Sequence, residues 1–501
     1  MSYLELLRLA APEAIVVVTA LAVLTIALTT ARALVLGPIV AALGVAVAIV
    51  AVVMLPSLAN LFGGMLVISP LNSLFKIICL ALALATVPLV SSEKALPNPG
   101  EYIAVLLLGS VGLMLLVGSE ELLMIFIGLE LLGLSLYVLA AFDKADVHSA
   151  EAGLKYFLFG STASAFTLFG ISLIYGLSGS TALAAIGQKL TTLPLQPLLA
   201  VGIVMTLIGF AFKIAAAPFH LWAPDAYQGA PIPSAAFIAS GSKVASFVVL
   251  GKIVLIGFGP VHGSADWHAM IAGWSPILAA LAAFSILLGN FVALAQTNVR
   301  RLLAYSAVAH GGYTLLGVVA GGREGFSATL FYTTTYAVTL IGAFAVVGAV
   351  RRETGGDDLQ NFSGLAARSP FLAACMAIFF LSLAGLPPLA GFFGKFYLFS
   401  AAFRAGGNHG LLWLVAIALF GSFVSLYYYL IVLKVIFVGE PSASTAQRGQ
   451  SNASAVRTLD LNASTAREFP SRATIALLAA VVLVLGIMPQ TLAAKIIASL
   501  P

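Results

Sequence analysis

The chain contains a long series of apolar stretches, each about twenty residues long, separated by short polar segments. A helix needs about twenty apolar residues to cross the hydrocarbon core of a bilayer, because it rises about 1.5 Å per residue. This rule predicts about fourteen membrane-spanning helices. Charged residues make up only 9% of the 501 residues, which excludes a soluble fold of this size. We therefore expect an all-α, multi-pass membrane protein.

The predicted helices follow short polar or proline-containing segments. Their starts are expected near Glu13, Ala33, Ser69, Gly100, Glu121, Ser149, Pro197, Pro231, Trp274, Arg301, Gly325, Pro370, Gly410 and Arg472. The first apolar stretch lacks a basic n-region and a clear cleavage site before it, so we expect it to be retained. The resulting division has N-terminal helices at 1–99, a first helical unit at 100–260, a second at 270–439, a polar loop at 440–471 and a C-terminal helix at 472–501.

Lysine and arginine residues are unevenly divided between the predicted loops. Twelve lie in odd-numbered loops, namely Arg32, Lys94, Lys144, Arg300, Arg301, Arg351, Arg352, Arg368, Arg448, Arg457, Arg467 and Arg472. Three lie in even-numbered loops, namely Lys189, Arg323 and Arg404. Because basic loops stay in the cytoplasm, this bias predicts cytoplasmic odd-numbered loops and periplasmic termini.

Four charged residues lie inside the apolar stretches themselves. They are Glu130, Lys213, Lys243 and Lys395. A charge in the hydrocarbon core costs at least about 2.5–3.5 kcal/mol, and such residues usually move protons or ions. Buried ion pairs that fix the helix register are the alternative explanation. That alternative leaves two central lysines without an acidic partner in their own stretches.

Prolines lie close to two of these lysines. Pro218 follows Lys213 by five residues, whereas Pro387 and Pro388 precede Lys395. Proline removes a backbone donor and clashes with the preceding turn, so both helices should break at these points. A break at membrane depth persists only inside protein or beside a hydrated cavity. The reversed order of lysine and break in the two segments is typical of an inverted-topology repeat.

Two other lysines have alternative interpretations. Lys155 either pairs with Glu130 across neighbouring helices or makes a local bridge to Glu151, four residues earlier. Lys252 lies nine residues after Lys243, and at about 100° per residue it points to the opposite face of the helix. We therefore expect Lys252 to extend toward a membrane interface, whereas Lys243 faces a central cavity.

Two histidines extend this set of candidate proton-transfer residues. His310 lies about ten residues into a predicted helix, and the next helix contributes the polar run Tyr332 to Tyr336. An imidazole titrates near physiological pH, so these residues suit a proton relay. His220 belongs to the predicted helix break after Lys213, where it acts either as a relay or as a cap.

Several kinds of chemistry find no support in the sequence. The two cysteines, Cys79 and Cys375, lie in separate apolar stretches and form no metal-binding or disulfide pattern. The sequence has no dinucleotide fingerprint and no P-loop. Its net charge of +5 does not indicate nucleic-acid binding, because the basic residues are scattered over the loops. A standalone transporter of an anionic substrate would need an arginine inside a span, and no predicted span core contains one.

Three segments carry a resemblance to a known family. They are FKIAAAPFHLWAPDAYQGAPIPSAAFIASGSK, RRLLAYSAVAHGGY and GLPPLAGFFGKFYLF. They resemble the antiporter-like membrane subunits of respiratory complex I, over nearly the whole chain and most strongly between residues 100 and 400. Within that family, Gly-Lys395-Phe-Tyr and the absence of a long C-terminal lateral helix resemble the N-type subunits of bacterial NADH-quinone oxidoreductases, relatives of mitochondrial NADH dehydrogenase subunit 2.

The resemblance implies a fold with two inverted five-helix repeats, two broken helices and a track of proton-carrying residues. Its members are the helix-five Glu130, the helix-six Lys155, the broken-helix Lys213 and Lys395, and the central Lys243. One departure is Asn72, near which many relatives are expected to have an acidic residue.

The resemblance also implies where the chain works and what surrounds it. NADH, FMN, Fe–S clusters and quinone are expected on other subunits, so this subunit would carry no cofactor and take part in no redox step. Its expected partners are M-type and small K-, J- and A-type membrane subunits and lipids, in a bacterial inner membrane. A subunit of a multisubunit monovalent cation/proton antiporter is the alternative, because that group shares the lysine track.

Overall fold

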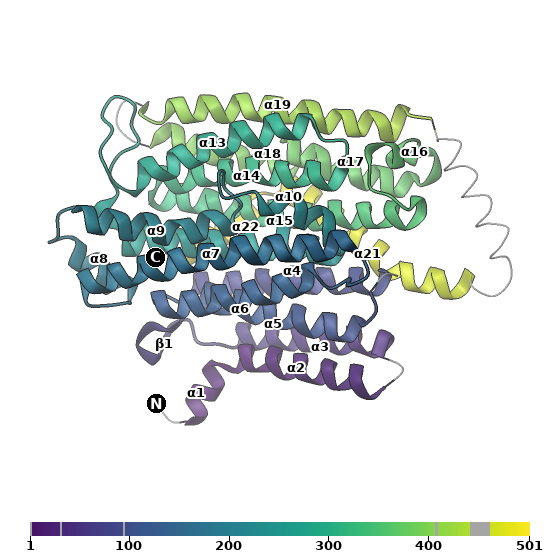
Figure 1. Ribbon diagram of the computed structural model, residues 1–501, viewed down its shortest axis with the longest axis horizontal. Helices are drawn as coiled ribbons and strands as arrows, with labels where there is room; N and C mark the ends of the chain where they lie inside the picture. Colours follow the sequence, from purple (N-terminus) through teal and green to yellow (C-terminus); the bar gives the residue numbers. More distant parts are fainter. Residues whose placement is uncertain (1–2, 31–32, 94–95, 406–408, 441–460, 501) are drawn as a thin grey trace.

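The computed structural model describes residues 3–30, 33–93, 96–405, 409–440 and 461–500 as a bundle of roughly aligned helices (Figure 1). Within these residues, twelve helices are long and apolar enough to cross a membrane. Two shorter apolar helices, Pro197–Lys213 and Pro370–Ala384, belong to the interrupted segments described below. The total reaches fourteen only if each interrupted segment is counted as one crossing, so the number fourteen stays a prediction. The all-α, multi-pass membrane architecture is confirmed.

The first part of the bundle runs from the N-terminus to the first interrupted helix. Its elements are α1 (Tyr3–Leu9), α2 (Ala11–Thr29), α3 (Ala33–Val53), β1 (Ala59–Leu61), η1 (Phe62–Gly64), β2 (Leu66–Ile68), α4 (Pro70–Ser92), α5 (Pro99–Gly118), α6 (Leu122–Ala140), α7 (Val147–Ser178), α8 (Leu183–Leu190), α9 (Pro197–Lys213) and α10 (Trp222–Gly229). Strands β1 and β2 form a small antiparallel hairpin, in which Ala59 is opposite Ile68.

The second part contains the most deeply buried helices. Its elements are α11 (Ile232–Ala239), α12 (Gly241–Lys252), η2 (Ile253–Gly257), η3 (Gly259–Val261), α13 (Trp274–Leu294), α14 (Val299–Ala320), α15 (Gly322–Thr354), η4 (Leu359–Phe362), α16 (Leu365–Arg368), α17 (Pro370–Ala384), α18 (Ala390–Arg404), α19 (Leu412–Val438), α21 (Leu461–Ile487) and α22 (Gln490–Ser499).

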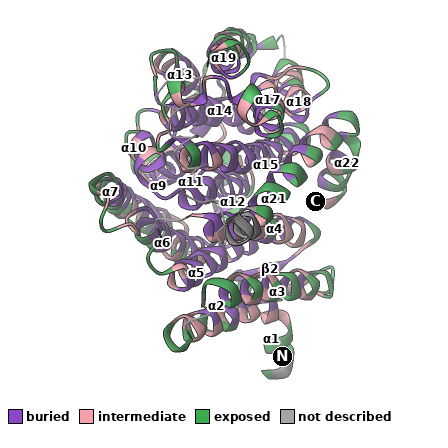
Figure 2. Ribbon diagram, turned by 90° about the vertical axis from the view of Figure 1, so that its right-hand side faces the viewer, coloured by how far each residue is buried: buried purple, intermediate pink, exposed green. Residues whose placement is uncertain are grey.

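The core of the bundle is a row of central helices with few exposed residues. Viewed from one end, α11, α12, α14 and α15 are mostly buried, whereas α2, α3 and α7 are exposed along one side (Figure 2). The central helices therefore have almost no surface that could face lipid within this chain. Any charge they carry must be accommodated by protein contacts.

Both predicted helix breaks are present. Helix α9 ends at Lys213, and Pro218 lies in the non-helical segment before α10. Pro387 and Pro388 lie in the segment between α17 and α18. As predicted, the first lysine precedes its break, and Lys395 in α18 follows its own.

The two ends of the bundle separate the loops as the charge pattern predicts. Backbone hydrogen bonds join three even-numbered loops at one end, where the N–H of Glu120 donates to the carbonyl of Gly64 and the N–H of Leu183 donates to Glu120. Both termini lie at this end (Figure 1). Odd-numbered loops meet at the other end, where Asp143, Pro231 and other residues line a shared pocket with Arg351. The described ends of the chain therefore lie on one side of the bundle.

The C-terminal part differs from the expected polar loop at 440–471 followed by a helix at 472–501. Residues 441–460 lie outside the described residues. Helix α21 begins at Leu461 and includes the segment LNASTARE before its apolar part, which starts at Phe469. Leucine, alanine, arginine and glutamate favour helix, which explains the earlier start. The chain then bends after Ile487 into the short helix α22.

Candidate functional site

Lys213 lies at the C-terminal end of α9 in an aromatic environment. Its Nζ atom lies 5.4 Å from the centre of the Tyr137 ring, 5.7 Å from that of Phe212 and 5.9 Å from that of Tyr156. The Tyr156 ring in turn stacks on Trp222, with 4.1 Å between ring centres. Within the described part of the chain, this buried Nζ atom has no hydrogen-bond partner. The three ring faces near the ammonium group attract cations.

Some of the backbone groups that lose their helical partners at the break after Lys213 make hydrogen bonds elsewhere in the protein. The indole Nε1 of Trp222 donates to the carbonyl of Phe212 at 3.0 Å, and the N–H of Ala217 donates to Ser285 Oγ at 2.9 Å. The backbone groups freed by the break are therefore partly re-paired inside the bundle, as a break at membrane depth requires.

Glu130 lies beside Lys213 without touching it. The two side chains, together with Phe126 and Ser164, line a small cavity of about 10 Å³. Ser164 Oγ donates a hydrogen bond to Glu130 Oε1. No ion pair of 4.0 Å or less joins Glu130 to Lys213, although both side chains are described. The cavity is close to the smallest volume that holds one water molecule, and both Glu130 and Lys213 line it.

The structure decides between the two alternatives for Lys155 and shows no pair with Glu130. Lys155 Nζ lies 2.5 Å from Glu151 Oε1 and 2.8 Å from Asp225 Oδ2, near the odd-loop end of α7. The local bridge to Glu151 is therefore the correct alternative. The α7 residue that reaches Glu130 is Ser164, which lies nine positions and about 13 Å farther along the helix. Lys155 is consequently outside the buried track.

Lys243 lies in the first turn of α12 and is buried. Its Nζ atom donates to the carbonyl of Ala307 at 2.7 Å and lies 5.6 Å from the centre of the Tyr336 ring. The neighbouring serines donate to backbone carbonyls of their own helices, since Ser240 donates to Ala236 at 2.6 Å and Ser246 donates to Ser242 at 2.7 Å. Among the described residues, Lys243 thus has one carbonyl acceptor and no carboxylate within ion-pair distance.

His310 connects three helices at the centre of the second part. Its Nδ1 atom lies 2.5 Å from the hydroxyl of Tyr332 on α15, and its Nε2 atom lies 3.1 Å from the hydroxyl of Tyr429 on α19. Both ring nitrogens therefore have hydroxyl partners, and one must donate while the other accepts if the imidazole is neutral. This arrangement can pass a proton across the ring without moving the backbone.

Lys395 lies beside the second helix break. Its Nζ atom donates to the carbonyl of Ala384 at 3.0 Å and to Ser422 Oγ at 2.9 Å, and it lies 5.1 Å from the centre of the Tyr313 ring. Ala384 is the last residue of α17, so its carbonyl is one of those that a helix end leaves unpaired. A cation at a helix C-terminus is favoured by the helix dipole.

Shared tyrosine rings join Lys243, His310 and Lys395 into one series. The Tyr336 ring lies against Lys243 and also 4.9 Å from the His310 ring, centre to centre. The Tyr313 ring lies against Lys395 and 5.6 Å from the His310 ring. The structure therefore brings these three residues together in the buried core.

His220 lies in the break between α9 and α10 and is buried. Its Nδ1 atom has no hydrogen-bond partner within the described residues, and its ring centre is 6.3 Å from that of Tyr305.

The prediction that Lys252 extends to a membrane interface is wrong. Lys252 is buried at the end of α12, where its Nζ atom donates to Asn72 Oδ1 at 2.5 Å and to the carbonyl of Val117 at 2.7 Å. Glu120 lies 3.8 Å away. The opposite face of α12 packs against α4 and α5 rather than lipid, so both lysines of this helix are inside protein.

A buried ion pair in the N-terminal helices was also missed by the sequence interpretation. Lys76 Nζ on α4 lies 2.6 Å from Glu13 Oε1 on α2, and both side chains are nearly inaccessible. The available signal was a charge of each sign in two early apolar stretches, LAAPEAIVVV and LNSLFKIICL. Opposite charges at similar depths in neighbouring helices favour such a pair.

Arg300 is fully buried at the start of α14, although no predicted span core contained an arginine. Its Nε atom donates to the carbonyl of Tyr227 at 2.7 Å, its Nη2 atom donates to the carbonyl of Ala230, and its Nη1 atom lies 3.4 Å from Asp357 Oδ2. Arg300 therefore holds the end of α10 and does not offer a free clamp for an anionic substrate.

Across the described residues, no group of three or more His, Cys, Asp or Glu side chains is placed to hold a metal ion. Cys79 and Cys375 are both buried and unpaired. The chemistry that the described side chains support is proton transfer among acids, amines and imidazoles.

The central part of the chain matches a known protein family. Residues 119–425 match the family described as NADH:quinone oxidoreductase/Mrp antiporter, TM. NADH-quinone oxidoreductase subunit N 2 of Acidobacterium capsulatum is 48% identical over 453 residues, covering 87% of this chain and 91% of that protein. NADH-quinone oxidoreductase subunit N of Moorella thermoacetica is 43% identical over 377 residues, covering 75% of this chain and 76% of that protein.

Solved structures share the same fold. A chain of respiratory complex I from Thermus thermophilus with bound aureothin superposes with a TM-score of 0.76 and 31% identity, covering 96% of this chain and 98% of that one. A chain of the Mrp complex from Dietzia sp. DQ12-45-1b superposes with a TM-score of 0.81 at 22% identity, covering 98% and 97%. The second similarity concerns the fold alone.

Proposed function

This chain belongs to the NADH-quinone oxidoreductase subunit N family, and from that premise we propose that protons cross it along Glu130, Lys213, Lys243, His310 and Lys395. It is a proton-translocating subunit of the membrane arm of complex I. The proposal goes beyond the family assignment because it names the side chains that hold the proton, which membership of the family alone does not identify.

The observation that carries the proposal is the series of tyrosine rings joining Lys243, His310 and Lys395 inside the most buried helices. Two lysines and a histidine in one buried core repel one another when more than one is charged. Protonation of one residue therefore favours release of a proton by the next. That repulsion is the driving force that a relay needs.

The first half of the track works through Glu130. Its carboxylate favours the charged form of Lys213 when a water or a direct contact joins them, and burial among aromatic rings disfavours that form when they separate. Moving one charge through 100 mV costs about 2.3 kcal/mol, and a shift of one to two pKa units is worth about 1.4–2.7 kcal/mol. Changing this single contact therefore supplies free energy of the required size.

Electron transfer is assigned by this proposal to other subunits. NADH, FMN, Fe–S clusters and quinone would bind there, and the present chain would contribute to the enzyme as a non-redox translocase subunit. M-type and small K-, J- and A-type subunits are the proposed neighbours. We place the chain in the bacterial inner membrane with odd-numbered loops cytoplasmic and both termini periplasmic, on the strength of the twelve-to-three charge bias.

The proposal is tested on the assembled complex in sealed proteoliposomes. Lys243→Ala, His310→Ala and Lys395→Ala should each lower NADH-driven proton uptake and coupled quinone reduction, with the complex still assembled. Co-purification at endogenous expression distinguishes a complex I subunit from the alternative, a cation/proton antiporter subunit. The antiporter subunit would be recovered without NADH-oxidising subunits. Normal proton-to-electron ratios in all three variants would refute the track.

A further inference from the structure

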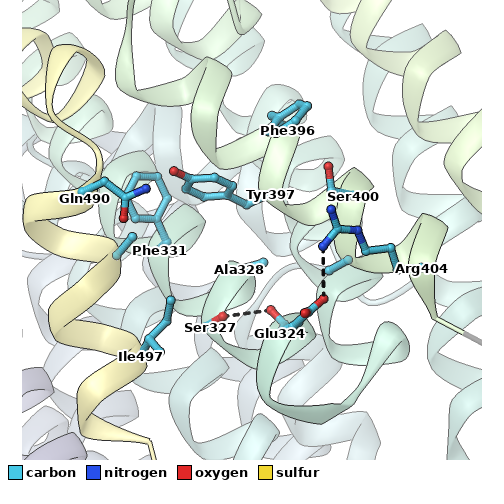
Figure 3. Close-up of a pocket in the computed structure, with 12 residues that line it drawn as sticks. Glu324, Ser327, Ala328, Phe331, Phe396, Tyr397, Ser400, Arg404, Gln490 and Ile497 are labelled. Atoms are coloured by element: carbon cyan, nitrogen blue, oxygen red, sulfur yellow. Dashed lines mark hydrogen bonds and ion pairs between the residues drawn. The ribbon is translucent and has the colours of Figure 1, made fainter.

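A groove lies on the side of the bundle between α15, α18 and α22 (Figure 3). Its volume is about 320 Å³, within the range of pockets that bind small molecules. Helix α22 forms one wall through Gln490 and Ile497. That wall is held in place because Arg323 Nη2 donates to the carbonyl of Ile497 at 2.9 Å.

The mouth of the groove carries one charge of each sign. Glu324 lies in the first turn of α15 and Arg404 is the last residue of α18, so both lie at the even-loop end. Arg404 Nη1 is 4.0 Å from Glu324 Oε2, and both side chains are 72% exposed. A pair this long and this exposed contributes little stability and leaves most of its hydrogen-bonding capacity free.

On α15 and α18 the groove lining changes from polar to apolar with depth. On α22 the order is the reverse, since Gln490 lies beside Phe331 and Tyr397 whereas Ile497 lies beside Ser327 (Figure 3). One turn inward from the charges are Ser327 on α15 and Ser400 on α18. Two turns inward, about 10 Å from the mouth, are Phe331 and Tyr397. Phe396 lies at the same depth and is 53% exposed, so an apolar ligand can cover it.

This order of layers matches an amphiphile that enters from one leaflet. We propose that the groove binds a phospholipid with a phosphoethanolamine headgroup, its phosphate on Arg404, its primary ammonium on Glu324 and an acyl chain against Phe331, Phe396 and Tyr397. The guanidinium group suits a phosphate because it offers several N–H donors in one plane. A carboxylate prefers a primary ammonium because it accepts N–H bonds, which the quaternary ammonium of phosphatidylcholine cannot donate.

The charges of Arg404 and Glu324 favour some lipid headgroups over others. Phosphatidylglycerol would satisfy Arg404 but bring no cation to Glu324. A neighbouring polypeptide could fill the apolar wall, yet the pairing of opposite charges above a serine layer and an aromatic floor favours a zwitterionic lipid. The site does not depend on the proton track, so its test does not stand or fall with the proposed function.

The test uses the assembled complex in nanodiscs of equal parts dioleoyl-phosphatidylethanolamine, -phosphatidylcholine and -phosphatidylglycerol. Lipids that remain after detergent exchange are counted by native mass spectrometry. The Glu324→Gln variant should lose its preference for phosphatidylethanolamine over phosphatidylcholine by roughly two- to fivefold, the range for an exposed charge contact. The Arg404→Gln variant should retain less of all three lipids.

Lys189→Gln, an exposed residue at the same end of the bundle, is the matched control and should retain lipids like the wild type. Ala401→Phe narrows the groove without touching either charge and should displace the same lipid, which keeps the test decisive if a charge variant assembles poorly. Unchanged phosphatidylethanolamine retention in the Glu324→Gln and Ala401→Phe variants, or electron density for a neighbouring subunit in the groove, would overturn the proposal.

Discussion

Lys252 Nζ and Asn72 Oδ1 lie 2.5 Å apart although 180 positions separate the two residues in sequence. The bond joins the end of α12, the helix that carries Lys243, to the start of α4 in the N-terminal helices. Glu13 and Lys76 form a second buried polar contact between α2 and α4. The first contact therefore fastens α4 to the central row, and the second fastens α2 to α4, by charge-assisted hydrogen bonds.

The first prediction concerns this junction. Lys252→Ala leaves Asn72 and the carbonyl of Val117 buried without a donor, and each unsatisfied group costs about 1–3 kcal/mol. We expect lower thermal stability or poorer assembly of the complex, measured by the midpoint of thermal unfolding in detergent. Lys189→Ala, on the exposed surface of α8, is the control. A Lys252→Ala complex as stable as this control would show that the junction is not needed.

The second prediction concerns Lys243 as a proton carrier. Lys243→Arg should fail almost as badly as Lys243→Ala, because a guanidinium group does not release its proton in the physiological range. We expect proton pumping to fall roughly tenfold or more in both variants. The measurement is the proton-to-electron ratio in reconstituted vesicles. A fully active Lys243→Arg enzyme would mean that the site needs only a fixed positive charge.

The third prediction concerns the gap between Glu130 and Lys213. Glu130→Gln should abolish most pumping because it removes the charge that favours protonated Lys213, and Glu130→Asp should retain part of the activity. Ser164→Ala removes the hydroxyl donor but keeps the carboxylate, so its effect should be smaller than that of Glu130→Gln. Equal pumping by Glu130→Gln and wild-type complexes would exclude Glu130 from the track.

The fourth prediction concerns Lys155, whose partners lie at the partly exposed end of the bundle. Its side chain is 39% exposed and pairs with Glu151 and Asp225. We expect Lys155→Ala to lower NADH-driven pumping less than Lys213→Ala does. A matched pair of initial-rate measurements in vesicles decides this point. If Lys155→Ala is the more severe variant, the proton path must pass through the odd-loop end of α7.

The fifth prediction concerns orientation. Lys144 and Lys189 are both exposed, and they lie in loops at opposite ends of the bundle. In a chain lacking Cys79 and Cys375, Lys189→Cys should react with a membrane-impermeant maleimide added outside intact spheroplasts. Lys144→Cys should react only after the membrane is opened. The reverse labelling pattern would invert the proposed topology.

The sequence predicts the bundle and its breaks because these depend on local chemistry. Twenty-residue apolar stretches specify helices across a bilayer, and Pro218 and Pro387 interrupt helices wherever they fold. The local bridge from Lys155 to Glu151 was one of two alternatives for the same reason, since residues four apart share a helix face.

The contacts of Lys252 and Lys76 could not be predicted because their partners come from distant segments. Helical periodicity placed Lys252 opposite Lys243, but a helix in the centre of a large bundle has no lipid-facing side. Periodicity gives the direction of a side chain and not the identity of what lies there. Likewise, the link from Lys243 through Tyr336 to His310 depends on the packing of α12, α14 and α15.

The missing hydrogen bond at Lys213 has a consequence for the speed of proton transfer. Lys243 and Lys395 must each release a carbonyl oxygen before the ammonium group can turn, and such bonds are worth about 4–6 kcal/mol in an apolar medium before any replacement forms. Every 1.4 kcal/mol of that barrier slows the step about tenfold. Within the described residues, Lys213 Nζ has no such bond to release and lies against the rings of Tyr137, Phe212 and Tyr156. The slow steps of a turnover should therefore lie beyond Lys213, at the two lysines that backbone carbonyls hold in place.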